Sequence, residues 1–407
     1  MPEPFLTADL PGTGGRIRES AEDFCVEEIP LYVASGSGEH TFVLIEKQNL
    51  TTHDLLRRAA DTYGVPEREI GYAGLKDARA TTRQTISVPH LDPDTADRLN
   101  SEGIRVLAAN RHQNKLRPGH LVGNRFRIRI RGCEAGSAAR AEAICSVLHK
   151  RGVPNFFGSQ RYGALGNSHR IGTAIIRGDF DTAMTELIGD PDRIDNERWR
   201  EAAIRFRAGD ANGALAVLPQ HCRFERQALQ ALTSGRSARK SLLGLSRNIL
   251  RLYLSACQSH LFDRLLTMRL ATLDTIWPGD FAYRHDNGSC FFVEDAAAEN
   301  ERAKNFTISA TGPLYGFKST LARGQSGILE ESLLASEKLQ LVDFKLGSGL
   351  DMPGERRPLR IPLADPTVAM NDGLVLSFAL PAGSYATSVL REVMKSPVAE
   401  KRSGRAD

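Results

Sequence analysis

The chain has 407 residues, of which 41% are hydrophobic and 25% are charged, and its formal net charge is +4. This composition is typical of a globular protein, and the length is sufficient for two domains. Because so small a positive charge does not by itself indicate a nucleic-acid ligand, the distribution of the charges along the chain has to be considered.

Several classes of protein are not favoured by the sequence. No run of about 18 apolar residues is present, so we expect no membrane-spanning helix. The start, Met1 to Phe5, lacks a basic region followed by an apolar one, so we expect no secretion signal. The six cysteines form no CxxC pair and the ten histidines form no HExxH motif. We therefore expect free thiols in a reducing compartment, the cytoplasm, and no metal site.

The first patterned segments follow a start rich in Pro and Gly, and we expect the residues before Arg16 to be poorly ordered. The run 24–29 predicts a short strand that ends at Pro30. The apolar run 41–45 predicts a second strand. Thr51 then offers an N-cap and Gly64 a C-cap for the helix between them.

The stretch Gly71–Gln84 contains a single acid, Asp77, among the cations Lys76, Arg79 and Arg83. An acid in a glycine-containing connection, close to cations, can stay ionised and present a bare carboxylate to a bound group. Such a carboxylate can act as a nucleophile. The alternative is an exposed, salt-bridged turn without a catalytic role.

Arginines alternate with apolar residues in the next informative segment, 125–131. Since successive side chains of a strand point to opposite faces, one face would be apolar and the other would carry a row of guanidinium groups. That row could follow an RNA phosphate backbone, or it could be a solvated strand face balanced by acids such as Glu134. The apolar face comprises Phe126, Ile128 and Ile130, and the basic face comprises Arg125, Arg127, Arg129 and Arg131.

A helical pattern over 141–148 precedes the segment Asn155–Gly163, in which three aromatic residues lie close to an Asn, a Gln and an Arg. Such side chains suit a pocket that stacks on a base and hydrogen-bonds its edge. The alternative is an aromatic-rich turn that packs against the core. From residue 181 onward helical, charge-mixed segments dominate, which fits an inserted domain. An apolar strand over 374–380 and a helix that begins after Ser384 follow, and we expect the residues after 400 to be frayed.

At least five of these segments together resemble, in the family's order, the TruD family of tRNA pseudouridine synthases. They include EDFCVEEI, GYAGLKDARATTRQ, GVPNFFGSQRYG, LYLSACQSHLF and LPAGSYATSVLREV. The resemblance implies an α/β (α+β) fold: a catalytic domain with a mixed antiparallel sheet and flanking helices, interrupted by an inserted α/β domain. The catalytic domain would comprise residues 1–180 and 360–407, and the inserted domain residues 181–359.

The resemblance also implies roles for individual residues. Asp77 would be the catalytic nucleophile, and Phe24, Asn155, Phe157 and Tyr385 would contact the substrate, with Phe157 stacked on the target base. From the residues alone, Phe24 can equally be a core aromatic. Tyr385 stands where the family is expected to have phenylalanine. The cation that pairs with Asp77 stays open. Candidate contacts to an RNA backbone are Lys76, Arg79, Arg125, Arg127, Arg129 and Arg161.

The implied activity is the isomerisation of uridine 13 in tRNA by a cytoplasmic monomer, without a metal or another cofactor. The sequence leaves open whether the carboxylate adds to the sugar or abstracts a proton to give a glycal. Two other functions also stay open. One is an RNA-binding protein without catalysis, and the other is a synthase that acts on a different RNA.

Overall fold

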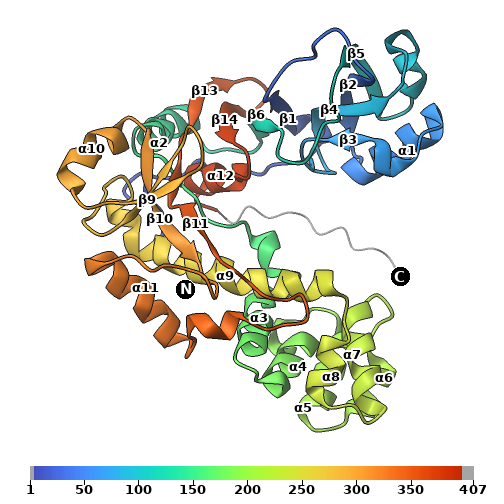
Figure 1. Ribbon diagram of the computed structural model, residues 1–407, viewed down its shortest axis with the longest axis vertical. Coiled ribbons are helices and arrows are strands. Elements are labelled where there is room, and N and C mark those ends of the chain that lie inside the picture. The colour runs from blue at the N-terminus through green and yellow to red at the C-terminus, as the bar shows by residue number, and fades with distance from the viewer. Residues whose placement is uncertain (1–3, 397–407) are drawn as a thin grey trace. The chain divides into compact units, whose positions relative to one another are not determined.

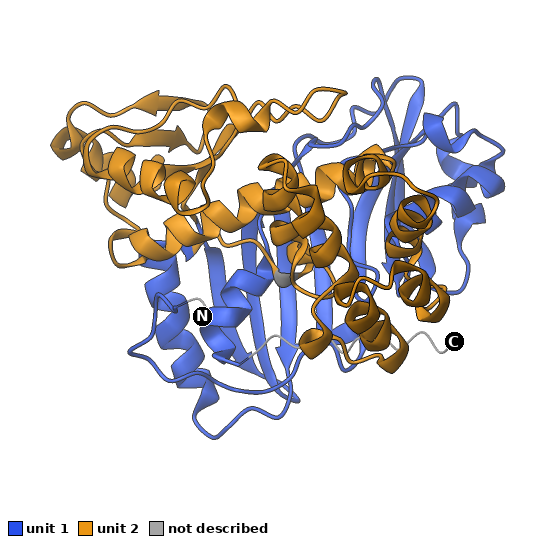
Figure 2. Ribbon diagram, turned by 90° about the horizontal axis from the view of Figure 1, so that it is seen from below, with its two compact units in different colours: residues 1–153, 361–407 blue, residues 154–360 orange. Residues whose placement is uncertain are grey.

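The computed structural model describes residues 4–396, and its chain divides into two compact units (Figure 2). Unit 1 comprises residues 1–153 and 361–407, and unit 2 comprises residues 154–360. The predicted frayed end, 400–407, lies outside the described residues. Within residues 4–396, no helix combines the length and the apolar character that crossing a membrane requires.

Unit 1 is built on an eight-stranded sheet of order β13-β14-β6-β1-β4-β2-β5, with β3 beside β4. The pair β1 and β4 is parallel and the other pairs are antiparallel. The strands are β1 (Phe24–Pro30), β2 (His40–Gln48), β3 (Gly71–Tyr72), β4 (Thr81–Pro89), β5 (Ile104–His112), β6 (Leu121–Ile130), β13 (Ala364–Met370) and β14 (Leu374–Pro381). The helices are α1 (Thr52–Tyr63), α2 (Ser137–Arg151) and α12 (Ala386–Met394), with short 3₁₀ turns at Ala21–Asp23, Glu67–Glu69 and Pro93–Leu99.

The hydrophobic core of unit 1 follows the predicted patterns. On β6 the apolar residues Phe126, Ile128 and Ile130 are buried, and they pack with residues of α2 and α12. A second cluster lies under α1. That helix has the predicted caps: the Thr51 side chain accepts a hydrogen bond from the Asp54 N–H, and Gly64 adopts a left-handed φ of 67°. Because only glycine adopts this conformation without a steric penalty, the helix ends there.

Residues 4–15 are ordered, contrary to our expectation from the Pro- and Gly-rich composition of the segment before Arg16. The buried Glu392 carboxylate of α12 accepts hydrogen bonds from the Leu6 N–H at 2.9 Å, the Thr7 N–H at 3.0 Å and the Thr7 hydroxyl at 2.7 Å. The Thr13 N–H also donates to the Val393 carbonyl. A buried carboxylate needs such donors, so the segment and α12 stabilise each other.

Unit 2 contains a helical part and a four-stranded sheet of order β11-β10-β8-β9, which lie at opposite ends of the long helix α9 (Figure 1). The helices are α3 (Ser168–Ile176), α4 (Phe180–Ile188), α5 (Glu197–Arg207), α6 (Ala211–Val217), α7 (Arg223–Thr233), α8 (Ala238–Leu243), α9 (Arg247–Arg269), α10 (Ala296–Lys304) and α11 (Gly324–Ser336). The strands are β8 (Phe281–Arg284), β9 (Cys290–Phe292), β10 (Ile308–Leu314) and β11 (Glu355–Pro358). The short strands β7 (Val153–Pro154) and β12 (Arg360–Ile361) carry the chain between the units.

Unit 2 begins at residue 154, whereas the sequence analysis placed the start of the inserted domain at residue 181. The reason is the packing of α3 against α4 and α9. Ile171 and Ile175 of α3 are buried in the same cluster as Leu254 and Leu261 of α9. The change in composition near residue 181 marks the start of the helix-rich part of the chain. It does not show that α3, which precedes this change, packs with the helices that follow it.

Candidate functional site

Asp77 lies in unit 1, on the connection 73–80 between β3 and β4, and its side chain is 44% exposed. The Arg18 Nη2 atom donates a hydrogen bond to its Oδ2 atom at 3.1 Å. The Arg18 side chain is only 14% exposed, and its guanidinium carbon lies 4.2 Å from the centroid of the Phe24 ring. The carboxylate is therefore open to a ligand while it is held beside a fixed cation, as a nucleophilic carboxylate requires.

Arg18 was not among the cations that the sequence suggested for Asp77. The two residues are 59 positions apart, and no local pattern links them. Arg18 has a φ of 61°, a left-handed conformation that costs a non-glycine residue about 1–2 kcal/mol. The ion pair and the cation–π contact with Phe24 offset this cost. Phe24 is fully buried, as expected if it is a core aromatic residue, and its ring packs against the Arg18 guanidinium.

Lys76, although next to Asp77 in sequence, points into the protein. Its ammonium forms an ion pair with Glu28 at 2.8 Å, and both side chains are 3% exposed. The Lys76 N–H donates to the Thr52 hydroxyl at 3.0 Å. A phosphate cannot reach this ammonium, so the expected contact with an RNA backbone does not fit its placement. Arg79, by contrast, is exposed.

Lys47 of β2 holds the main chain of Asp77. Its buried ammonium donates hydrogen bonds to the carbonyl oxygens of Leu50, at 2.5 Å, and Asp77, at 3.2 Å. The pKa of Lys47 is lowered to about 8. Burial is the main cause and the positive charge on Lys76 adds to it, whereas the negative charge on Asp77 acts in the opposite direction. This contact could not be predicted from the sequence, because Lys47 stands in an ordinary strand pattern.

The arginine row of β6 divides into a structural and an exposed half. Arg131 donates two hydrogen bonds of 2.9 Å to the fully buried Asp23, and Arg129 lies 3.4 Å from the same carboxylate. Burial raises the pKa of Asp23, but the hydrogen bonds from Arg131 and the Ser20 N–H outweigh it, so that the pKa lies below its ordinary value. These two arginines therefore serve the fold.

Arg125 and Arg127 are exposed, on the face opposite to the core, as predicted. Their neighbours across the sheet differ. Arg125 is paired in register with Glu27 of β1, whereas Arg127 is paired with Cys25 of β1 and Ser377 of β14. Since no acid stands directly across from Arg127, its charge is compensated least, and it is the strongest candidate of the row for a phosphate contact.

Asn155 and Phe157 lie in unit 2, within one cluster. The Asn155 Nδ2 atom donates to the Pro358 carbonyl at 2.8 Å, and its Oδ1 atom accepts from the Arg357 guanidinium at 2.5 Å. The same guanidinium lies 4.4 Å from the centroid of the Phe157 ring. The Phe157 N–H donates to Asp263 of α9 at 3.0 Å. Asn155 and Phe157 are both buried. The sequence did not indicate Arg357 or Asp263, which come from distant segments.

The remaining predicted residues are placed as follows. Arg161 belongs to the cluster of unit 2, where its Nε atom donates to the Ser259 hydroxyl at 3.0 Å. Tyr385 of unit 1 is 38% exposed and occupies the N-cap position of α12, one residue after the Ser384 that the sequence suggested as the cap. Among residues 4–396, no group of His, Cys, Asp or Glu side chains is arranged to hold a metal ion.

Nearly the whole chain is similar to known proteins in sequence and in fold. The family model described as "tRNA pseudouridine synthase D (TruD)" matches residues 3–393. The tRNA pseudouridine synthase D of Syntrophotalea carbinolica is 53% identical over 396 residues, which cover 97% of this chain and 99% of that one. The protein of the same name from Geobacter metallireducens is 52% identical, covering 96% and 97%. The crystal structure of a TruD chain from Methanosarcina mazei superposes with a TM-score of 0.85 at 29% identity, covering 97% of this chain and 96% of that one.

Proposed function

Since this chain belongs to the TruD family of tRNA pseudouridine synthases, we propose that it converts uridine 13 of tRNA to pseudouridine with Asp77 as the catalytic nucleophile. The observation that carries the proposal is the exposed Asp77 carboxylate. Arg18 holds the Asp77 side chain, and Lys47 holds the Asp77 main-chain carbonyl. A fixed, ionised carboxylate in an accessible connection is the group that this isomerisation needs.

The proposed reaction uses few groups of the protein. The uridine leaves its stack, because the sugar and the base are otherwise out of reach. Attack by the Asp77 carboxylate on the sugar, or abstraction of a sugar proton, releases uracil as the N-glycosidic bond breaks. The detached uracil, which keeps the bonding electrons on N1, turns. Its C5 atom then forms a bond to the sugar as the bond from the sugar to Asp77 breaks or, in the glycal route, as the sugar regains its proton. C5 finally loses its proton and N1 gains one. Atoms are conserved, so no oxidant and no second substrate enter the reaction.

We extend the proposal to the contacts of the base. Tyr385 of unit 1 and Phe157 of unit 2 are each proposed to offer a flat surface to the uracil, and Asn155 is proposed to hydrogen-bond its edge. The family resemblance of the two motifs supports these roles. Phe24 is proposed to act indirectly, because Arg18 lies over its ring and is positioned by it.

The proposed partner is tRNA, bound by a monomer in the cytoplasm. Arg127, Arg125 and Arg79 are exposed and are proposed to contact the phosphate backbone. The six cysteines are all free, which agrees with a reducing compartment.

The proposal is tested with purified protein and unmodified tRNA transcripts. Pseudouridine should form at position 13 and at no other position, and a transcript with cytidine at position 13 should stay unmodified. Modification at a different uridine would show a different target. Binding of the transcripts without any pseudouridine would favour the RNA-binding protein without catalysis.

Replacing Arg18 with glutamine should lower the rate of pseudouridine formation by about 10²-fold, because the Asp77 carboxylate loses the cation that orients it. The first turnover of tRNA with enzyme in excess measures this rate. Arg16→Gln is the matched control, since Arg16 is exposed and pairs only with the exposed Glu19 among the described residues. Equal rates for the two variants would contradict the role of Arg18.

Lys47 should make the free energy of unfolding depend on pH. Its pKa is near 8 in the folded chain and near 10.5 when unfolded, so between these values the unfolded chain binds the additional proton. Stability therefore rises with pH in this window, by at most about 3 kcal/mol, and is constant below it. Chemical unfolding from pH 7 to pH 10 should show this slope in the wild type, in excess of any slope in Lys47→Met. Parallel curves for the two proteins would contradict it.

A further inference from the structure

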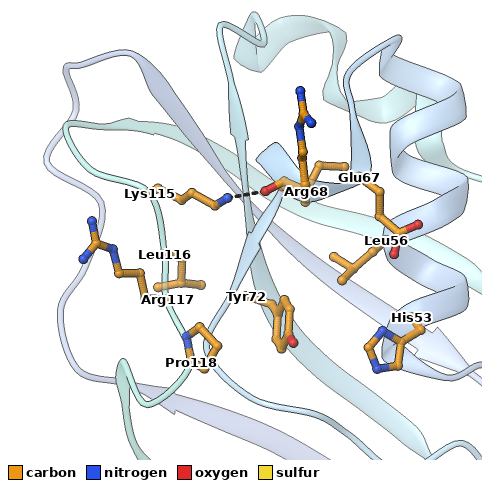
Figure 3. Close-up of a pocket in the computed structure, with 10 residues that line it drawn as sticks. His53, Leu56, Glu67, Arg68, Tyr72, Lys115, Leu116, Arg117 and Pro118 are labelled. Atoms are coloured by element: carbon orange, nitrogen blue, oxygen red, sulfur yellow. Dashed lines mark hydrogen bonds between the residues drawn. The ribbon is translucent and has the colours of Figure 1, made fainter. Parts of the chain in front are cut away.

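Unit 1 contains a pocket of about 740 Å³ that the proposed reaction does not use (Figure 3). It lies between α1, β3 and the segment 115–118, and its lining includes His53, Tyr72 and Pro118. A space of this size accommodates a nucleotide. The Tyr72 ring projects into the pocket between Pro118 on one side and His53 on the other (Figure 3).

The pocket offers a stacking surface with polar atoms around it. Tyr72 is only partly buried, and its hydroxyl has no hydrogen-bond partner among residues 4–396. The His53 imidazole, which is exposed, also lacks a partner in this part of the chain. An accessible aromatic face beside free donors and acceptors suits a nucleobase, which presents both a flat surface and a polar edge.

The charges around the pocket suit a phosphate. Arg68 and Arg117 are exposed, and within the described residues neither guanidinium forms an ion pair. The Lys115 ammonium donates to the Arg68 carbonyl at 2.6 Å and so fixes the position of the Arg68 main chain. Glu67 is the single acid of the lining. The Arg68 and Arg117 guanidinium groups extend outward at the rim of the pocket, away from the Tyr72 ring (Figure 3), so they suit phosphates of an RNA strand that passes over the rim.

The walls of the pocket are bonded to the Asp77 connection. The Gly119 N–H donates to the Ala73 carbonyl at 2.8 Å, and the Lys76 N–H donates to Thr52, the neighbour of His53. Tyr72 precedes Asp77 by five residues, so their Cα atoms are at most about 18 Å apart. Within unit 1, the pocket and the carboxylate are thus fixed within reach of one short stretch of RNA.

We propose that this pocket binds a second nucleotide of the substrate RNA, close in sequence to the target uridine, with its base stacked on Tyr72 and with phosphates of the flanking RNA near Arg68 and Arg117. This inference rests on the proposed function. The pocket contributes to the recognition of the RNA and not to the chemical step, so its loss should raise KM and leave kcat unchanged.

The test combines protein variants with abasic RNA. Transcripts that lack one base each, at the positions on either side of uridine 13, are compared with the intact tRNA. One abasic position should weaken binding to the wild type by about 10-fold, the usual effect of one stacked base. Tyr72→Ala should weaken binding of intact tRNA by the same factor and should be insensitive to that abasic position. Tyr72→Phe keeps the ring and should keep the sensitivity.

The guanidinium groups are tested by salt dependence, which stays informative if Tyr72→Ala does not fold. Arg117→Ala should reduce the slope of log Kd against log salt by about one, and Arg58→Ala, an exposed arginine on α1, should leave it unchanged. Equal slopes for both variants, together with additive effects of Tyr72→Ala and every abasic position, would overturn the inference. Because binding is measured without turnover, a failure here is distinct from a failure of the Asp77 proposal, which would appear as wild-type protein that forms no pseudouridine.

Discussion

An Asp77→Asn protein is expected to bind tRNA as tightly as the wild type and to form no detectable pseudouridine, a loss of at least about 10⁴-fold in rate. The amide has nearly the shape of the carboxylate, so the connection 73–80 should keep its conformation. It carries no negative charge, however, and can neither attack the sugar nor accept its proton. Release of tritium from tRNA labelled at C5 of uridine measures the reaction, because the C5 proton is lost when the new bond forms.

Glu19→Gln provides the matched control for this loss. Glu19 is 41% exposed and pairs with Arg16 at 2.7 Å, so its environment is close to that of Asp77 beside Arg18. The control should release tritium at the wild-type rate. If Asp77→Asn kept more than a tenth of that rate, the nucleophile would have to be another group, and the exposed, salt-bridged turn would be the correct interpretation of Asp77.

Lys76→Met should destabilise unit 1 by about 3–5 kcal/mol, which is a large part of the stability of a typical domain. The substitution leaves the buried Glu28 carboxylate without its cation, and the cost of an unpaired buried charge exceeds the value of the pair itself. Urea unfolding followed by a probe in unit 1 measures the change. The double variant Glu28→Leu with Lys76→Met removes both charges and should recover most of the loss.

An exposed pair gives the comparison for this effect. Lys304 and Glu301 of α10 are 2.6 Å apart, and both side chains are exposed to solvent. Lys304→Met should change the free energy of unfolding by less than about 1 kcal/mol, because water already solvates both charges. Similar losses in the free energy of unfolding for Lys304→Met and Lys76→Met would show that burial does not determine how much the Lys76–Glu28 pair contributes to stability.

The elements that the sequence predicted correctly are those set by neighbouring residues. The strand β6 follows from strict alternation of arginine and apolar residues, and α1 follows from the cap at Thr51 and the glycine at position 64. The period of two and the cap geometry are local properties of the chain, so a single sequence reveals them.

The contacts that the sequence did not reveal join distant segments. Arg18 reaches Asp77 because β1 and β4 pair in parallel, Cys25 opposite Thr81, which brings the chain before β1 beside the connection before β4. Lys47 reaches the same connection from β2, which also pairs with β4. Sheet order decides these contacts, and sheet order is a property of the whole fold. Asp77 was singled out through the family resemblance of its motif, whereas Arg18, the cation beside it, comes from a distant segment that no local pattern links to it.

The discontinuous composition of unit 1 has a consequence for its folding during synthesis. The strand β6 pairs on one side with β14, and the N-terminal segment is bound by Glu392. Both segments are translated early, and their partners are translated last. Residues 154–360 are contiguous and can complete their own core first. Until β14 emerges from the ribosome, β6 presents an unpaired edge that can join a wrong strand. The interval between translation of residue 130 and of residue 381 is thus the period in which the nascent chain is most exposed to aggregation, and in which protection by a chaperone would matter most.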